Sequence, residues 1–332
     1  MIECKHLQMV KKPLVLLVCG CAVWFGAVIL VKENRALSMT MCPTVNTPQS
    51  PSHPFSAGFH TLVTPLGVVS PNFSAPCFIH RTCKNPNALD ELNPTEKENF
   101  VMSWMEKSPP TCNTILWHDQ LGTELIQEFE PSLLPQYTWL HTGTERGDVV
   151  RLVALYHFGG VYADMDISLV KNFKDWTFGH NGVGMIVAME YCKNNTRNHK
   201  TDFGVIQFAF AAVPGHHVVR RALEMFNENV RIERTTGDVY YKNYGYNAKI
   251  MRRTGPVVLS NAVKEELAAH GKTWVDVCDS RKPYKIPDSD VLILPLRSFN
   301  SPHNCITSYG VTRHYYQSKW ASKSRNSWYV PQ

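Results

Sequence analysis

Hydrophobic and polar residues alternate strictly through the stretch VYADMDISLV, from Val161 to Val170. A period of two residues predicts a β-strand with one apolar face, and it places Asp164 and Asp166 together on the opposite face. Two carboxylates held this close raise the cost of ionising each other, so a positive group is expected beside them. The stretch therefore marks a candidate site for a cation.

A helix is expected immediately before this strand. Thr142 is followed three residues later by Glu145, which is the pattern of a capping box. Gly159 and Gly160 are expected to end the helix. Between these signals, apolar residues recur at helical spacing: Val149, Leu152, Val153 and Tyr156.

Strand-like and helix-like segments alternate through the rest of the chain after residue 76. Strands are expected at 77–82, 114–119 and 291–296, helices at 96–106 and 218–230, and strands or buried helices at 184–190 and 203–216. Alternation of this kind favours an α/β fold in which helices flank a sheet. Ligands of such folds bind at the C-terminal ends of strands, where the predicted strand carries its two aspartates.

The N-terminal part predicts a membrane anchor followed by a linker. Residues 13–31 contain no charged side chain, which is about the length that a transmembrane helix needs. The flanking lysines favour a cytoplasmic tail at 1–12 and a lumenal location for the rest, and a span this short suits the thin membranes of the endoplasmic reticulum or Golgi. A cleaved signal peptide, ending near 36–38, is the alternative. Residues 32–75, rich in Pro, Ser and Thr, predict a flexible stem before a globular domain at 76–332.

Composition narrows the class of protein. Hydrophobic residues make up 44% of the 332-residue chain, enough for a large core. The formal charge of +6 is spread without a dense Lys/Arg run, which argues against a nucleic-acid-binding surface. Neither a CxxC pair nor a Cys/His zinc spacing occurs. His216 and His217 follow a Pro-Gly turn and are expected to be solvated.

A lumenal domain would lie in an oxidising compartment, so its cysteines are expected to form disulfides. Seven cysteines follow the predicted span: Cys42, Cys77, Cys83, Cys112, Cys192, Cys278 and Cys305. Cys278 and Cys305 flank a late strand, and we expect them to pair. Two acceptor patterns for N-glycosylation, at Asn72 and Asn194, lie on the predicted lumenal side.

Asp164 and Asp166 offer hard oxygen ligands, which suit Mg²⁺ or Mn²⁺ bound together with a substrate diphosphate. Such a cation would stabilise negative charge on a departing diphosphate. Three other interpretations stay open. The pair could be a solvated surface turn, the site of a haloacid-dehalogenase-type phosphatase with Asp164 as nucleophile, or a remnant in a non-catalytic protein that keeps the fold.

The stretch ERGDVVRLVALYHFGGVYADMDISLVKNF, residues 145–173, resembles the DxD sugar-binding region of glycosyltransferase family 32. That family includes initiating α-1,6-mannosyltransferases, inositol-phosphoceramide mannosyltransferases and, more distantly, α-1,4-galactosyltransferases. FIHRTCKNP resembles its opening IHQTWK strand, with Cys83 where Trp is usual. TGP at 254–256 and RHYYQSKWASKSRNSW at 313–328 resemble later blocks, so the resemblance covers most of 77–328.

The resemblance implies a GT-A-like nucleotide-binding sheet with flanking helices, and a metal-dependent, retaining glycosyltransferase. It implies a UDP- or GDP-hexose donor, Mn²⁺ or Mg²⁺, and a glycan or glycolipid acceptor. With the predicted anchor, the protein would be a single-pass type II membrane protein of the Golgi or endoplasmic reticulum, with a lumenal catalytic domain at 76–332.

Several residues match the family's functional positions. Asp166 matches the direct metal ligand, and Asp164 matches the carboxylate that contacts both the donor and the metal shell. Asp148 and Arg151 match the pair that reaches the donor, and Tyr162 matches an aromatic beside the nucleoside. The remaining matches are His314 as a late metal ligand, Trp320 as a donor contact and Gln207 where an Asn usually faces the sugar.

Simpler interpretations of these residues also stand. Asp148 and Arg151 could form a surface ion pair one helical turn apart, worth a few tenths of a kcal/mol. Tyr162 could lie on an exposed sheet surface. His314 could be a core histidine, and Trp320 could serve packing alone.

Overall fold

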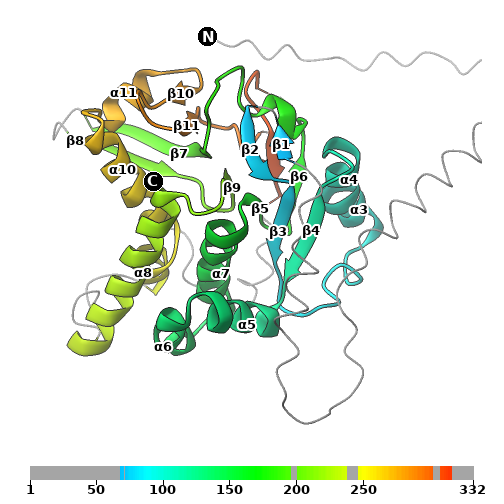
Figure 1. Ribbon diagram of the computed structural model, residues 1–332, viewed down its shortest axis with the longest axis vertical. Coiled ribbons are helices and arrows are strands. Elements are labelled where there is room, and N and C mark those ends of the chain that lie inside the picture. The colour runs from blue at the N-terminus through cyan, green and yellow to red at the C-terminus, as the bar shows by residue number, and fades with distance from the viewer. Residues whose placement is uncertain (1–67, 71, 196–199, 238–245, 302–306, 316–332) are drawn as a thin grey trace, which may run out of the picture.

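The computed structural model describes residues 68–70, 72–195, 200–237, 246–301 and 307–315 (Figure 1). The predicted anchor and most of the predicted stem lie outside these residues. Within the part of the chain that is described, no helix is both long and apolar enough to cross a membrane.

An eight-stranded mixed sheet forms the centre of the molecule (Figure 1). Its strands are β3 (Phe78–Thr82), β4 (Asn113–Trp117), β5 (Gly160–Ala163), β7 (Met185–Asn195), β8 (Lys200–Val205), β9 (Ala209–Ala212), β10 (Tyr284–Lys285) and β11 (Val291–Leu294). The order is β10-β11-β7-β9-β5-β3-β4, with β8 paired to β7. Strands β3, β4 and β5 run parallel to one another, whereas β9 is antiparallel to both β5 and β7. The expected α/β sheet is confirmed.

Helices flank this sheet, as the alternating sequence pattern predicts, and most of them pack on one face. The helices are α3 (Pro94–Lys97), α4 (Ser103–Lys107), α5 (Asp119–Phe129), α6 (Leu134–Trp139), α7 (Gly143–Phe158), α8 (His217–Thr236), α9 (Tyr246–Arg253), α10 (Pro256–Ala269) and α11 (Trp274–Asp279). Apolar side chains of α5, α7, α8 and α10 form one core cluster with the sheet. A second cluster on the other face includes α4 and the hairpin β1 (Val68–Ser70)–β2 (Phe73–Pro76). The sheet is therefore buried on both faces, which explains why its strands read as nearly continuous apolar runs.

The helix expected at 96–106 is present but is not a regular α-helix. It begins at Pro94 behind the N-cap Asn93, whose side chain accepts a hydrogen bond from the Glu96 N–H. A π-helical turn (Glu98–Met102) separates α3 from α4. The chain leaves the helix after Lys107, because the residue before a proline disfavours helical dihedrals.

Helix α7 begins and ends where the sequence predicts. The Thr142 hydroxyl accepts a hydrogen bond from the Glu145 N–H, and the Glu145 carboxylate accepts one from the Thr142 N–H, both at 3.1 Å. At the other end, Gly159 and Gly160 have φ values of 64° and 103°. A Cβ at Gly160 would lie 2.6 Å from the Phe78 carbonyl oxygen. Both glycines are therefore needed to turn the chain directly from α7 into β5.

The strand predicted over 161–170 is two strands. Strand β5 ends at Ala163, a turn spans residues 164–166, and β6 (Ile167–Leu169) leaves the main sheet to pair with β12 (Thr312–His314). The prediction of one strand face carrying both carboxylates was wrong. The alternation misled because the apolar residues of β5 and of β6 pack into the same core cluster. We call residues 164–166 the DxD turn.

The disulfides differ from the predicted pair. Cys77 is bonded to Cys112, and Cys192 is bonded to Cys278. The predicted Cys278–Cys305 pair was wrong, because α11 packs against the β7–β8 hairpin and brings Cys278 to Cys192 on β7. Cys305 lies outside the described residues. Segments close to each other in space, not in sequence, decided the pairing.

Candidate functional site

The DxD turn lies at the C-terminal end of β5, between strands β9 and β3 of the main sheet. The Asp164 N–H donates to the Phe208 carbonyl at 2.8 Å, and the Ile167 N–H donates to the Asp164 carbonyl at 3.2 Å. These bonds fix the backbone of the turn. The side chains of Asp164 and Asp166 remain 31% and 17% exposed, so both carboxylates are open to a ligand.

Asp164 is oriented by two side chains from neighbouring elements. The Tyr162 hydroxyl donates to Asp164 Oδ1 at 2.5 Å and is 2.8 Å from the Thr82 hydroxyl. Burial raises the pKa of Tyr162 well above its ordinary value, so its hydroxyl keeps the proton that it donates. Arg151 Nη2 lies 3.5 Å from the same Oδ1 atom. Asp164 thus accepts a hydrogen bond from the neutral Tyr162 hydroxyl and faces the positively charged Arg151 guanidinium.

Tyr162 is fully buried, and the Arg151 guanidinium carbon lies 4.6 Å from its ring centroid. The interpretation of Tyr162 as exposed sheet surface was therefore wrong. Its expected contact with a nucleoside stays a prediction. In this structure, Tyr162 contributes to the site through its hydroxyl, which donates a hydrogen bond to Asp164.

Four residues beside Asp164 form a closed ring of polar contacts. Arg151 Nη2 pairs with Asp148 Oδ1 at 3.0 Å, and Arg151 Nη1 donates to the Gln207 carbonyl at 2.9 Å. The Thr254 hydroxyl donates to Asp148 Oδ2 at 2.8 Å, and Gln207 Nε2 donates to the Thr254 carbonyl at 3.1 Å. The ring joins α7, the β8–β9 loop and the α9–α10 connection. It holds the Arg151 guanidinium in place beside the DxD turn, and we call these four residues the polar ring.

Asp148 and Arg151 are 4% and 7% exposed, so the interpretation as a surface ion pair was wrong. Burial raises the pKa of Asp148 to about 6, although Arg151 and Thr254 favour its ionised form. Burial also opposes the charge of Arg151, but Tyr162, Asp164 and Asp148 raise its pKa above the ordinary value. At neutral pH the buried pair is therefore ionised, and it loses its negative member first on acidification.

His314 lies beside Asp166 although 147 residues lie between them in the chain. Strand β12 pairs with β6 so that His314 is opposite Ile167. Its Nε2 atom is 3.3 Å from Asp166 Oδ1, and its ring packs 4.2 Å from the ring of Phe208. The structure thus brings His314, an expected metal ligand, next to Asp166 in the DxD turn. Trp320 lies outside the described residues.

Gln207 is 3% exposed, and its backbone and its amide nitrogen belong to the polar ring around Arg151. Its Oε1 atom is buried and accepts no hydrogen bond from the residues that the structure describes. The expected contact of Gln207 with a sugar stays a prediction, and this acceptor atom is the one available for it.

The side chains at the DxD turn are of the types that bind a divalent cation. Asp164 and Asp166 supply partly exposed carboxylate oxygens, and His314 supplies an imidazole nitrogen. Mg²⁺ and Mn²⁺ favour such oxygen ligands and bind through one or two carboxylates together with substrate phosphates. The three side chains would leave the rest of the coordination shell to the phosphates.

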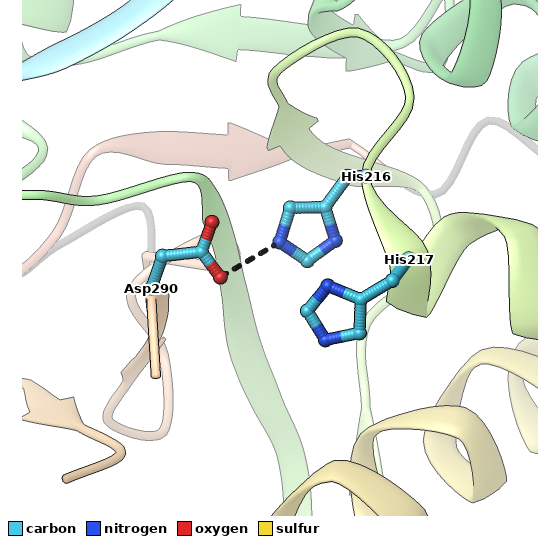
Figure 2. A group of neighbouring side chains, drawn as sticks. All are labelled: His216, His217 and Asp290. Carbon is cyan, nitrogen blue, oxygen red and sulfur yellow. Dashed lines mark hydrogen bonds and ion pairs between the residues drawn. The ribbon is translucent and has the colours of Figure 1, made fainter. Parts of the chain in front are cut away.

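A second group of possible ligands, His216, His217 and Asp290, has atoms within 4.8 Å of one another (Figure 2). It lies at the opposite edge of the sheet, because Ala212 at the end of β9 is paired with Gly160 at the start of β5. His216 Nδ1 accepts from the Val218 N–H at 3.2 Å, so its proton is on Nε2, which donates to Asp290 at 3.2 Å.

A metal-binding histidine needs a lone pair on the nitrogen that faces the metal. The proton on Nε2 of His216 therefore gives this group a structural role, in which His216 caps α8 and fastens it to Asp290. His216 is 3% exposed, so the expectation that it is solvated was wrong. The side chain of His217 is 60% exposed, as expected, and contacts Glu266 at 2.7 Å.

Sequence reasoning missed two buried residues of the site, Arg81 and Thr254. Thr254 belongs to the TGP block, and Pro256 at the first position of α10 marks the start of a helix there. That signal locates Thr254 before a helix but does not reveal its bond to Asp148. Arg81 follows three buried residues of β3, and the pattern indicates only a strand end.

Comparisons with known proteins connect this geometry to a family. Residues 94–182 match the family model described as the glycosyltransferase sugar-binding region containing the DXD motif. The putative glycosyltransferase HOC1 of Saccharomyces cerevisiae is 26% identical over 248 residues, which cover 69% of this chain and 59% of that protein. The initiation-specific alpha-1,6-mannosyltransferase of Schizosaccharomyces pombe is 23% identical over 241 residues, which cover 68% and 57%.

Inositol phosphoceramide mannosyltransferase 3 of Schizosaccharomyces pombe is 40% identical over 92 residues, covering 28% of this chain and 24% of that protein. The chain therefore spans less than two thirds of the length of these relatives. Among solved structures, the PaToxG glycosyltransferase matches with a TM-score of 0.36 at 14% identity, covering 73% of this chain and 82% of that chain. At this TM-score and identity, no residue of that structure is matched to a residue of this chain.

Proposed function

The chain belongs to the glycosyltransferases whose sugar-binding region contains a DXD motif, and from this premise we propose a metal-dependent, retaining hexosyltransferase. Its donor would be a UDP- or GDP-hexose, and its acceptor a glycan or a glycolipid. The observation that carries the proposal is the DxD turn, where two partly exposed carboxylates face Arg151 and His314 at the C-terminal end of β5.

Asp164, Asp166 and His314 would hold Mn²⁺ or Mg²⁺ together with the donor diphosphate. A bound divalent cation stabilises the negative charge that develops on the leaving diphosphate. Arg151 adds a fixed positive charge 3.5 Å from Asp164, and its polar ring keeps it oriented before the donor arrives. Preorganised charge of this kind lowers a barrier because little reorganisation is needed during the reaction.

The sugar would lie toward Gln207. A sugar hydroxyl would satisfy Gln207 Oε1, which has unused acceptor capacity among the described residues. The bond between the anomeric carbon and the diphosphate breaks, and an acceptor hydroxyl forms the new bond on the same face of the sugar. The acceptor's proton would leave with the diphosphate, so that charge is balanced without a dedicated base.

Mannose is the hexose that we place first, because the relatives named above include mannosyltransferases. We propose a location in the Golgi or endoplasmic reticulum, with residues 13–31 as a type II anchor and the residues between this anchor and the β1–β2 hairpin as a stem. Two disulfides in the described part of the chain support an oxidising lumen for the catalytic domain. Resistance of this domain to protease in intact microsomes tests the orientation, and complete digestion there would contradict it.

The decisive experiment compares Asp166→Ala with the unchanged chain in a donor screen. UDP- and GDP-hexoses are supplied with Mn²⁺, and both donor hydrolysis and transfer are measured. We expect Asp166→Ala to lower both rates by orders of magnitude, since each tenfold loss requires only about 1.4 kcal/mol. Its fold should be retained, because the side chain lies in a turn and is partly exposed.

Asp175→Ala is the matched control, since Asp175 is exposed and follows the DxD turn by only nine residues. It should keep the rate of the unchanged chain. Metal-dependent turnover retained by Asp166→Ala would contradict the metal-site proposal. A covalent phosphate trapped on Asp164 would instead support the phosphatase alternative.

A further inference from the structure

Strand β3 delivers Arg81 to the same edge of the sheet as the DxD turn. His80, the preceding residue, pairs with Tyr162 on the parallel strand β5. Side chains alternate along a strand, so His80 and Arg81 lie on opposite faces of the sheet. His80 contacts Trp117 on the face covered by α5, α7, α8 and α10, whereas Arg81 faces α4 and the DxD turn.

Arg81 supports the DxD turn from the side of α4. Its Nη1 atom donates at 3.5 Å to the carbonyl of Met165, the middle residue of the turn. Its guanidinium carbon lies 4.9 Å from the centroid of the Trp104 ring. Trp104 in turn donates from Nε1 to the Ile167 carbonyl at 2.7 Å. Arg81 and Trp104 therefore hold the backbone on which both aspartates stand.

The charge of Arg81 is buried, and it forms no ion pair with another residue that the structure describes. The residue is 2% exposed, and its Nη2 atom makes no hydrogen bond with any residue that the structure describes. Burial lowers the pKa of Arg81 to about 10, while nearby Tyr162, Asp166 and Asp164 favour its charge. The group therefore stays protonated at neutral pH. Burying a charge without an ion-pair partner costs free energy. We therefore ask how the electric field of Arg81 affects the two aspartates.

Two other side chains of the site lie close to the carboxylates. Arg151 faces Asp164 at 3.5 Å, and His314 faces Asp166 at 3.3 Å. Arg81 stands behind the turn and contacts its backbone, so its field acts on both carboxylates together.

We propose that Arg81 is a fixed positive charge that makes cation binding at the DxD turn depend on the diphosphate. It offsets the repulsion between Asp164 and Asp166 before a ligand binds. It also repels a free divalent cation, which carries two positive charges, and attracts a cation–nucleoside diphosphate complex, whose net charge is negative. The inference rests on the proposed function, because it assumes a cation at Asp164 and Asp166.

The test is a pair of affinities measured on the full purified chain. Binding of Mn²⁺ alone, and of Mn²⁺ in the presence of UDP or GDP, is followed through the electron paramagnetic resonance signal of the free ion. For Arg81→Gln, we expect Mn²⁺ alone to bind about tenfold more tightly and the Mn²⁺–nucleotide complex about tenfold more weakly. Gln keeps a donor for the Met165 carbonyl but removes the charge.

Arg81→Lys is the matched control because it keeps the charge, and both of its affinities should stay near those of the unchanged chain. Weakening of both affinities in Arg81→Gln would mean that Arg81 only supports the turn, which overturns the inference. If Arg81→Gln binds both Mn²⁺ alone and the Mn²⁺–nucleotide complex as tightly as the unchanged chain does, the inference is also overturned. If Arg81→Gln does not fold, Arg81→Lys decides alone, since a change in the ratio of its two affinities contradicts the role of the charge.

Asp166→Ala in the same assay separates the two proposals. If it leaves Mn²⁺ binding unchanged, or if the unchanged chain binds no Mn²⁺ with either nucleotide, then the proposed metal site fails and the inference about Arg81 fails with it. If Asp166→Ala removes Mn²⁺ binding while Arg81→Gln shifts neither affinity, only the inference about Arg81 is wrong.

Discussion

Thr254 joins three segments of the chain at one buried point. Its hydroxyl donates to Asp148 on α7, its carbonyl accepts from Gln207 in the β8–β9 loop, and its N–H donates to Ile250 on α9. The residue is 1% exposed. Without the hydroxyl, a buried oxygen of Asp148 would lose its donor, which costs about 1–3 kcal/mol. Thr254, which contacts no expected ligand, can therefore influence the charge of Asp148, which is expected to contact the donor.

We predict that Thr254→Val shifts the pH dependence of donor binding upward. The Thr254 hydrogen bond favours ionised Asp148, so removing it raises the pKa of Asp148 further above about 6. Below that pKa, Asp148 is neutral and no longer balances Arg151. The donor KM should begin to rise at a higher pH than in the unchanged chain, as a pH profile of KM would show.

Thr254→Ser restores the hydroxyl and should restore the profile. A purely packing role for Thr254 would lower stability without moving the acid limb of the KM profile. An unshifted acid limb in Thr254→Val would therefore contradict the link from Thr254 through Asp148 to Arg151.

At the scale of elements, the junction between α7 and β5 determines the position of the DxD turn. Gly159 and Gly160 turn the chain within two residues, and His80 on β3 donates to the Gly159 carbonyl at 2.8 Å. Strand β5 then continues for only four residues to Ala163, so its starting position determines where the DxD turn lies. The position of the site thus depends on a helix end that lies only a few residues before the DxD turn.

We predict that Gly160→Ala destabilises the fold by about 1–3 kcal/mol, the usual cost of a strained backbone position. Its φ is 103°, and the added Cβ would lie 2.6 Å from the Phe78 carbonyl oxygen. Gly143→Ala is the matched control, because Gly143 starts the same helix, has no atom within 4 Å of an added Cβ and lacks a positive φ.

Denaturant unfolding of both variants tests this prediction. Gly143→Ala should leave the free energy of unfolding unchanged or increase it by up to about 1 kcal/mol, as alanine favours helices over glycine. Equal destabilisation by the two substitutions would show that strain at the junction is not the cause.

At the scale of the whole molecule, two buried groups oppose each other on acidification. His80 accepts a hydrogen bond at Nδ1 from Trp117 and donates from Nε2 to Gly159, so it is neutral. Burial lowers the pKa of His80 to about 4, from an ordinary value of 6.5. Burial raises the pKa of Asp148 to about 6, from 3.8.

Between pH 6 and pH 4 the two effects have opposite signs. Unfolded His80 takes up a proton in this window and folded His80 does not, so its contribution to stability is lost as the pH falls. Folded Asp148 takes up a proton and unfolded Asp148 does not, so its contribution grows as the pH falls. Together they leave the free energy of unfolding nearly independent of pH, as far as these two groups are concerned.

We predict that Asp148→Asn uncovers the effect of His80. Stability should then fall more steeply from pH 6 to pH 4, by up to about 1.4 kcal/mol for each pH unit relative to the unchanged chain. Urea unfolding at several pH values, with disulfides intact, measures this slope. Asp175→Asn, at an exposed position, should leave the slope unchanged. An unaltered slope in Asp148→Asn would mean that Asp148 is already ionised throughout this window.

The sequence by itself determined those features that depend on neighbours in the chain. The capping box of Thr142 and Glu145, the glycine stop at Gly159 and the position of Asp164 at a strand end are all as predicted. Each follows from local geometry, because caps, positive φ angles and strand ends are set within a few residues. The family resemblance added Asp148, Arg151 and His314 to the expected site.

Only the tertiary structure decided what depends on partners distant in the chain. The pairing of β6 with β12 breaks the apparent single strand and places His314 beside Asp166. Packing of α11 on the β7–β8 hairpin selects the Cys192–Cys278 disulfide. Arg81 and Thr254 reach the site from different segments and leave no local pattern. Their roles arise from burial and from contacts across the fold, which the periodicity of apolar residues does not record.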